Sequence, residues 1–280
     1  MEPSTVSKQL FFNTVRIDTR KADGTTGSGT GFVFLQSQNS LHYPFIVTNK
    51  HVIADSISTG ITFITKKDGK PQLGNGFRLS IEGLGDAWHG HPDENVDVTV
   101  IPLAPLEERI KELGQEIFVQ PITKEIIALE DDLRSLDAIE EVTFIGYPNG
   151  LWDSKHLTPI LRKGHTATPI ELNFQGRPIF LIDASVFPGS SGSPVFILNQ
   201  GSYMKDGNVI LGSRLIFVGI VAEVFVKQDI NNLLEITLPT ANKQFATISN
   251  QMIDLGLVFK STTVIEAIKS CIAEREKANT

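Results

Sequence analysis

The stretch DASVFPGSSGSPV, residues 183–195, decides how this chain is interpreted. Two glycines bracket two serines, a proline closes the cluster, and an apolar, strand-like run follows. Such a cluster forms either a plain tight turn or a backbone cradle that exposes one nucleophilic hydroxyl, because glycine adopts backbone conformations closed to other residues. The rest of the sequence has to distinguish these two structures.

The composition is that of an ordinary globular protein. The chain has 280 residues, of which 41% are hydrophobic and 20% charged, enough for one large domain or two smaller ones. The net charge of −7 argues against nucleic acid or an acidic membrane surface as a partner. No apolar run approaches the roughly 20 residues of a membrane-spanning helix.

The cellular compartment is predicted from two features. The N-terminal residues MEPSTVSKQLFF lack the basic and apolar regions of a secretion signal. The single cysteine, Cys271, permits no disulfide within the chain, which is typical of a reducing compartment. We therefore expect a cytoplasmic protein.

Short apolar or β-branched runs recur between Gly, Pro, Asn and Asp breaks. They lie at 31–35, 43–48, 61–65, 96–103, 142–147, 178–183, 193–198 and 215–226. Many short strands separated by turn signals predict an all-β sandwich or barrel.

Helical patterns are scarce. One lies at 105–113. The other is the C-terminus, where Thr263 and Glu266 fit a capping box and Ile265, Ile268 and Ile272 form an apolar stripe. We expect Cys271 to be buried beside that stripe.

A hydroxyl nucleophile needs a base, an orienting acid and an oxyanion hole. Of the six histidines, His51 is the one that comes directly off an apolar strand, in FIVTNKHVI (45–53). Asp97 immediately precedes a strongly alternating strand. Gly189 leaves the backbone free to turn, so that its N–H and that of Ser191 can point at one position.

Three motifs together resemble a known family. TNKHV (48–52), VDVTVI (96–101) and GSSGSP (189–194) follow one another in the order His, Asp, Ser, as in the chymotrypsin-like serine proteases. DASVFPGSSGSPV resembles the nucleophile region of the high-temperature-requirement (HtrA-type) branch, and GSGTGFVF (27–34) and FIGYPNG (144–150) are similar to that branch as well. The resemblance covers roughly residues 10 to 226.

The resemblance implies a set of catalytic roles. Ser191 is the nucleophile, His51 the general base and Asp97 the orienting carboxylate, while the backbone N–H groups of Gly189 and Ser191 form the oxyanion hole. The motif places the nucleophile directly before Gly192, which excludes Ser190. The implied activity is that of a serine endopeptidase, which cleaves polypeptides through an acyl-enzyme without a cofactor or a metal.

The implied fold is all-β, with two antiparallel six-stranded β-barrels, the site in the cleft between them, and a C-terminal helix. We expect the first barrel at 1–104, a connection at 105–137, the second barrel at 138–260 and the helix at 261–280. The residues after 226 are too few for a peptide-binding PDZ module, so we expect none to follow.

The chain departs from the family pattern on both sides of the nucleophile, where Ser190 and Ser193 replace the frequent Asn and Gly. Serine at the second of these positions also occurs in glutamyl endopeptidases of the same fold. The strand at 219–225 lacks the histidine with which those enzymes bind glutamate, so we do not infer glutamyl specificity.

The resemblance places the primary substrate pocket before the nucleophile turn and on the later strand. We expect it to be lined by Ser185, Val186, Ala222, Glu223 and Val224. The residues before the turn are uncharged, which predicts a small or medium apolar residue before the scissile bond. Glu223 leaves two readings open, a solvent-facing residue or a contact for a basic substrate residue.

Two further motifs suggest ligands. GTTGSGTG (24–31) lacks the G-K-[ST] ending of a phosphate loop and precedes a strand, which indicates a β-turn. DAWHGHPDE (86–94) contains two histidines and three carboxylates, yet residues so close in sequence usually form a solvated loop, and we expect no metal there.

Two alternatives to the peptidase remain open. One is a binding or scaffold protein that keeps the protease fold without turnover, and the other is an esterase using the same triad. The expected partner is a polypeptide substrate, and a regulatory protein or ligand is left open.

Overall fold

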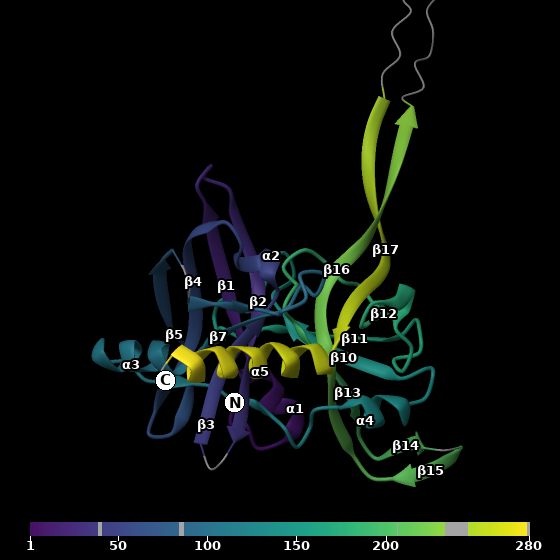
Figure 1. Cartoon of the computed structure of the whole chain (residues 1–280), viewed down its shortest axis with the longest axis horizontal. Coiled ribbons are helices and arrows are strands. Elements are labelled where there is room, and N and C mark those ends of the chain that lie inside the picture. Colours follow the sequence, from purple (N-terminus) through teal and green to yellow (C-terminus); the bar gives the residue numbers. More distant parts are fainter. Residues whose placement is uncertain (39–40, 84–86, 206, 233–245, 279–280) are drawn as a thin grey trace, which may run out of the picture.

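The computed structural model describes residues 1–38, 41–83, 87–205, 207–232 and 246–278, with the backbone alone at 223–232, 246–253 and 278. None of the described helices is long and apolar enough to cross a membrane. The chain folds into two β-structures, with a C-terminal helix running from one to the other (Figure 1).

The first β-structure is a barrel-like sheet of nine strands among the described residues, in the order β5-β4-β1-β2-β3-β7-β6, with β8 paired to β4 and β9 to β2. Three of the nine, β6, β8 and β9, are only two residues long. The strands are β1 (Thr14–Lys21), β2 (Thr26–Gln38), β3 (Leu41–Thr48), β4 (Ser56–Lys67), β5 (Lys70–Glu82), β6 (His89–Gly90), β7 (Thr99–Pro102), β8 (Ile117–Phe118) and β9 (Ile122–Thr123).

The second β-structure is a closed six-stranded barrel in the order β10-β11-β12-β17-β16-β13. Beyond it, β16 and β17 continue as a long two-stranded ribbon (Figure 1). The strands are β10 (Glu141–Gly146), β11 (Ile160–Thr166), β12 (Ile179–Asp183), β13 (Pro194–Asn199), β16 (Arg214–Asn232) and β17 (Ala246–Lys260).

Short helices and one hairpin fill the connections. The hairpin β14–β15 lies between β13 and β16 and is a separate two-stranded sheet. These elements are α1 (Val6–Gln9), η1 (Leu10–Phe12), α2 (Lys50–Ile53), α3 (Ala104–Glu112), α4 (Glu130–Arg134), η3 (Pro148–Gly150), η4 (Phe174–Gly176), β14 (Ser202–Lys205), β15 (Asn208–Leu211) and α5 (Ser261–Ala278).

The predicted fold class is confirmed. The structure contains a strand at each of the eight apolar runs and a helix at 104–112 and at 261–278. The segment 105–137 joins the two β-structures and also contributes β8 and β9 to the first sheet. The proposed domain boundaries stay a prediction.

The C-terminal helix α5 packs against both β-structures. Its apolar stripe shares a buried cluster with residues of the first sheet and of the second barrel, and Cys271 is buried as predicted. The predicted capping box is wrong, because Thr263 Oγ1 donates to the carbonyl of Lys260 and Glu266 bonds elsewhere.

The loop around His89 and His91 is the docking site of α5, which corrects the expectation of a solvated loop. His91 is buried, and its Nε2 lies 2.9 Å from the Glu266 carboxylate. His89 Nε2 lies 3.1 Å from the hydroxyl of Ser270. Asp86 lies outside the described residues, within which no group of three or more potential metal ligands is gathered.

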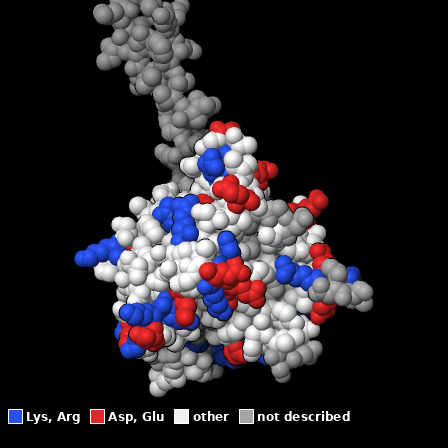
Figure 2. All heavy atoms as spheres, turned by 90° about the vertical axis from the view of Figure 1, so that its left-hand side faces the viewer, with Lys and Arg blue, Asp and Glu red and all other residues white. Residues whose placement is uncertain are grey.

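The surface over the first sheet carries charges of both signs. Figure 2 shows basic and acidic side chains interspersed on this face, without a large field of one sign. Any excess of one charge on this face is therefore local, on the scale of a single cavity.

Candidate active site

The ends of two paired strands bring His51 and Asp97 together. Strands β3 and β7 are antiparallel, with Thr48 opposite Thr99. His51 follows Thr48 by three residues, in the single turn of α2, and Asp97 precedes Thr99 by two, so both lie at the same edge of the first sheet.

The contact between these two residues is bidentate. Nδ1 of His51 is hydrogen-bonded to Oδ2 of Asp97, and the His51 backbone N–H donates to Oδ1 at 3.0 Å. Asn49, fully buried, donates from Nδ2 to the Asp97 carbonyl at 2.6 Å. With Nδ1 engaged by the carboxylate, Nε2 of the half-exposed imidazole is left to accept a proton.

Ser191 lies in the turn between β12 and β13, at the contact between the two β-structures. The Thr30 N–H donates to the Ser191 carbonyl at 2.9 Å. Gly192 has φ +88°, and a Cβ there would lie 1.7 Å from the Thr30 carbonyl oxygen and 2.7 Å from Thr48 Oγ1. Only glycine fits at this position, for reasons of both backbone conformation and space.

The two predicted oxyanion donors are the N–H groups of Gly189 and Ser191. Each shares its peptide group with the carbonyl of the preceding residue, and that carbonyl is hydrogen-bonded. The Pro188 carbonyl accepts from the Asn149 N–H at 2.5 Å, and the Ser190 carbonyl accepts from the Ser193 N–H at 2.9 Å. Because C=O and N–H point in opposite directions in a trans peptide, the N–H groups of Gly189 and Ser191 point away from these anchors. Neither N–H has an acceptor within the described part of the chain.

Thr30, on β2 of the first sheet, is hydrogen-bonded to the turn between β12 and β13 and helps to hold it in place. Its Oγ1 donates to the Gly189 carbonyl at 3.0 Å and accepts from the Tyr147 N–H at 3.1 Å. Gly189 itself has φ +85°, where a Cβ would lie 2.5 Å from the Tyr147 carbonyl oxygen. The turn is thus built for two glycines and held by both β-structures.

The hydroxyl of Ser191 is directed at β16. Its Oγ donates to the Ala222 carbonyl at 2.9 Å, and no hydrogen bond joins it to His51 among the described residues. The pairing of β16 with β17 skips a residue between Val221 and Glu223, and such a bulge re-aims a backbone carbonyl.

A half-buried arginine lies under the nucleophile turn. Arg162, on β11, donates to the carbonyl of Ser185 at 2.6 Å and to Ser190 Oγ at 2.7 Å. Its guanidinium lies 4.5 Å from the centre of the Phe144 ring, and Nε is buried without a hydrogen-bond partner. Burial lowers the pKa of Arg162 to about 10, and no carboxylate among the described residues pairs with it.

The predicted pocket residues are only partly described. Val186 is buried in the core of the second barrel, the Ser185 carbonyl is bonded to Arg162, and the Ala222 carbonyl receives the Ser191 hydroxyl. The side chains of Glu223 and Val224 lie outside the described residues. The pocket assignment stays a prediction.

Sequence reasoning missed Thr30 and Arg162, both of which hold the turn. The glycine-rich run at 27–31 gives a weak signal for Thr30, since it marks a strand approached closely by another backbone. Arg162 lies in a mostly polar strand, ILRKGHT, and nothing local distinguishes it from an exposed arginine.

Two β-structures that meet at a histidine–aspartate pair and a glycine-bracketed serine turn form the trypsin-like fold. Residues 29–203 match the model of the trypsin-like peptidase domain family. The match covers more than half of the chain, which therefore belongs to that family. No curated protein matches the chain.

Solved structures of proteases are similar to this chain at low identity. The active form of the Rv3671c protease from M. tuberculosis is 17% identical, with 94% of this chain and 82% of that chain covered and a TM-score of 0.47. Catalytically active tobacco etch virus protease complexed with product is 14% identical, with coverages of 80% and 73% and a TM-score of 0.45.

Proposed function

We propose that this chain is a serine endopeptidase that hydrolyses peptide bonds through an acyl-enzyme intermediate, with Ser191, His51 and Asp97 as its catalytic triad. The observation that supports this most is the arrangement of the nucleophile turn. The N–H groups of Gly189 and Ser191 are both oriented by bonded carbonyls and both lack an acceptor in the described residues. Free N–H donors held in place are what stabilises a developing oxyanion.

The reaction begins when Ser191 Oγ attacks the scissile carbonyl carbon and its proton passes to His51 Nε2. The carbonyl oxygen takes the negative charge between the two N–H donors. When the intermediate collapses, the C–N bond breaks and His51 returns the proton to the leaving amine. Water then hydrolyses the acyl ester by the same route, and Asp97 stabilises the imidazolium each time it forms.

Before attack, Ser191 has to leave the Ala222 carbonyl. A rotation about one side-chain torsion exchanges that hydrogen bond for one to His51, and such a rotation is one between staggered rotamers of a short side chain. The backbone that positions the serine does not have to move for this step.

For the residue before the scissile bond, we propose a small or medium apolar side chain. The Arg162 guanidinium is bonded to the Ser185 carbonyl, so a basic side chain in a pocket lined by Ser185 would bring two like charges together. Within the family we propose kinship with the HtrA-type branch, supported by the motif at 183–195. We propose a cytoplasmic location, supported by the single, buried Cys271.

A second candidate is a binding protein that keeps the fold without turnover. The hydrogen bond from Ser191 to Ala222, in place of one to His51, favours it. The two candidates differ in whether Ser191 can be made nucleophilic.

A fluorophosphonate probe separates the candidates, because it phosphonylates a serine only where a base activates the hydroxyl. We expect wild type to take up label at Ser191, as mapped by peptide mass spectrometry, and Ser191→Ala to take up none. Ser202→Ala, an exposed serine on β14, is the matched control and should label like wild type. Folded wild-type protein that takes up no label would support the binding protein.

A further inference from the structure

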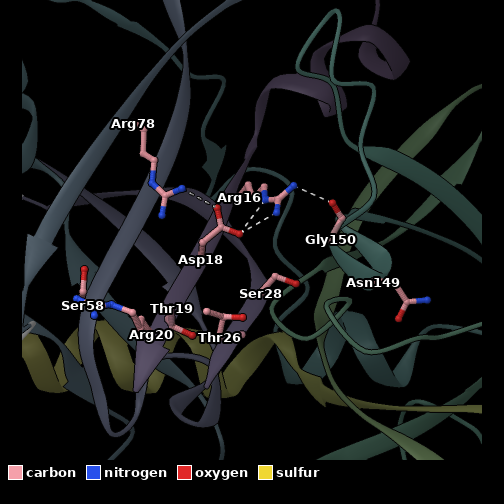
Figure 3. Close-up of a pocket in the computed structure, with 11 residues that line it drawn as sticks. Arg16, Asp18, Thr19, Arg20, Thr26, Ser28, Ser58, Arg78, Asn149 and Gly150 are labelled. Atoms are coloured by element: carbon pink, nitrogen blue, oxygen red, sulfur yellow. Dashed lines mark hydrogen bonds and ion pairs between the residues drawn. The ribbon is translucent and has the colours of Figure 1, made fainter. Parts of the chain in front are cut away.

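A cavity of about 520 Å³ opens on the first sheet beside the nucleophile turn, and its lining is rich in arginine. Such a volume is within the range of ligand sites. The cationic part of the lining comes from β1, where side chains alternate between the two faces of the sheet. Val15 and Ile17 are buried, so Arg16, Asp18 and Arg20 share the opposite face (Figure 3).

A third arginine reaches this face from two strands away. Arg78 lies on β5 and extends across β4 to Asp18, with Nη1 at 3.5 Å from Oδ2. Gly60 of β4 makes this crossing possible, since a Cβ there would lie 2.3 Å from Arg78 Nε. The sequence thus keeps a glycine where any side chain would push the guanidinium away.

The guanidinium groups of the cavity outnumber its carboxylates. Asp18 is the single acid among the lining residues, and it already bonds Arg16 at 2.9 Å. Arg78 is 55% exposed, and the side chain of Arg20 has neither an ion pair nor a hydrogen bond within the described chain. The nearby acid at the rim, Glu82, accepts a hydrogen bond from Ser58. In a protein of net charge −7, this local excess of positive charge is suited to an anion.

Hydroxyl and amide donors complete the lining, which is polar throughout. Arg16 is held in one orientation, because Nη1 donates to the Gly150 carbonyl at 2.8 Å and the guanidinium lies 5.0 Å from the centre of the Trp152 ring (Figure 3). The remaining polar lining is supplied by Thr19, Thr26, Ser28, Ser58 and Asn149. Guanidinium groups with neighbouring hydroxyls are the usual recognition elements for a carboxylate.

The cavity adjoins one end of the nucleophile turn. Asn149 and Gly150 belong to its lining, and the position of a Cβ on Gly189 would lie 3.0 Å and 3.2 Å from their backbone nitrogens. Ser28 lies two residues before Thr30, which is bonded to Ser191. The other end of the turn contacts β16, where Gly192 donates to the Val221 carbonyl.

We propose that this cavity binds a carboxylate of the substrate on the leaving-group side of the scissile bond, with Arg20 and Arg78 as its ligands. The proposal rests on the proposed function, because the leaving-group side is defined only if Ser191 attacks a peptide bond. The cavity lies at the end of the turn remote from β16. Residues before the scissile bond are expected along β16, so the residues after it extend toward Asn149 and Gly150. The carboxylate belongs either to an acidic side chain or to the C-terminus of the peptide.

The first test uses the full chain and internally quenched peptides built on a sequence that wild type cleaves. Glutamate and glutamine are exchanged in turn at each position after the scissile bond, in peptides with a free or an amidated C-terminus. We expect kcat/KM to be about tenfold higher for a carboxylate at one position, the gain of one charge-assisted hydrogen bond. A preference that depends on the free terminus assigns the cavity to the chain end, and one that depends on glutamate assigns it to a side chain.

The double variant Arg20→Gln/Arg78→Gln should lose this preference, whereas Arg109→Gln, an exposed arginine on α3, should keep it. A wild-type enzyme without preference, or a double variant that keeps it, overturns the proposal. Fluorophosphonate labelling of wild type is scored separately, so that a labelled enzyme without preference refutes the cavity assignment alone.

A binding measurement on Ser191→Ala protein tests the cavity without turnover. Fluorescence anisotropy compares a fluorescein-labelled peptide of alternating glutamate and alanine with its glutamine counterpart. We expect tighter binding of the glutamate peptide, and loss of that difference when Arg20→Gln/Arg78→Gln is added. Equal affinity for the two peptides contradicts the proposal even if the chain never cleaves a peptide.

Discussion

In the first barrel, His51 and Asp97 are joined by two hydrogen bonds, whereas in the second barrel the Ser191 hydroxyl is bonded to Ala222. The first-barrel half of the site, His51 and Asp97, is held together through the Asp97 side chain. The serine half, the turn at 189–192, is held through its backbone: its carbonyls are hydrogen-bonded, and its glycines fit against Thr30 and Tyr147.

The difference lies in what each half demands of the fold. Two strand ends suffice to bring His51 to Asp97, because β3 and β7 are paired neighbours. The serine turn needs contacts from both barrels, and in the proposed mechanism the Ser191 side chain still has to rotate toward His51. Variants in the two halves should therefore fail in different ways.

The largest effect is expected from removing either end of the proton relay. Ser191→Ala and His51→Ala should each lower kcat by about 10⁵- to 10⁶-fold, and the double variant should be little worse, because triad effects are not additive. Peptide hydrolysis by highly purified protein measures this. Losses that multiply in the double variant would mean that the two residues act separately.

Asp97→Asn should come next, with a fall in kcat of about 10⁴-fold, because the amide favours the wrong histidine tautomer. Thermal unfolding should show a folded protein, since the amide keeps an oxygen for the His51 N–H. Activity within tenfold of wild type would show that the first-barrel pair does not orient the base.

Arg162→Met should reduce the rate of fluorophosphonate labelling by about 100-fold, because a displacement of the turn by an ångström misplaces the nucleophile. Met fills the volume but leaves the buried Ser190 hydroxyl and the Ser185 carbonyl without the guanidinium. Arg134→Met, an exposed arginine on α4, is the control. Unchanged labelling of Arg162→Met would remove this residue from the serine half.

We expect the charge of Arg162 to set an upper limit to the pH range in which fluorophosphonate labelling is fast. Burial lowers its pKa to about 10, so the cation is present below pH 10 and is lost as pH rises through it. The labelling rate of wild type should fall there, in contrast to that of Arg162→Met. Because the folded-state pKa is depressed below that of the unfolded chain, the cost of burying the cation is present in full below pH 10 and is relieved as pH rises above 10. A parallel pH profile for both proteins would contradict this role.

The smallest effect is expected from Thr30→Val. The variant keeps the shape but leaves the Gly189 carbonyl and the Tyr147 N–H without their partner, at a cost of about 1–3 kcal/mol in the free energy of unfolding. We expect labelling to slow by about tenfold. Denaturant unfolding measures the stability, and a variant as stable and as reactive as wild type would show that Thr30 does not hold the turn.

The sequence predicts the backbone-determined part of the molecule well. Apolar runs mark eight strands, and the glycines at 189 and 192 mark the turn, because each pattern reflects a local requirement of the chain. Four long strands escaped prediction, β1, β5, β11 and β17. In β1 the charged Arg16, Asp18 and Arg20 alternate with buried residues, and β5 contains two interior glycines, so neither resembles an apolar run.

Features made by residues distant in sequence were not predictable. Arg162 meets Ser190 only because β11 passes under the turn, and Arg78 meets Asp18 only across Gly60. His91 meets Glu266 because α5 folds back onto the first sheet. Each of these contacts depends on the tertiary arrangement, and a single sequence contains no local signal for it.

The order of strands in the second barrel has a consequence for synthesis of the protein. β17 lies between β12 and β16 in the closed barrel, although it is made about 60 residues after Ser191 and needs further chain length to emerge from the ribosome. A nascent chain that already contains His51, Asp97 and Ser191, the three residues of the proposed triad, still lacks one wall of the barrel that holds the serine. If the proposed activity depends on the closed barrel, we expect it to begin only after translation has passed β17.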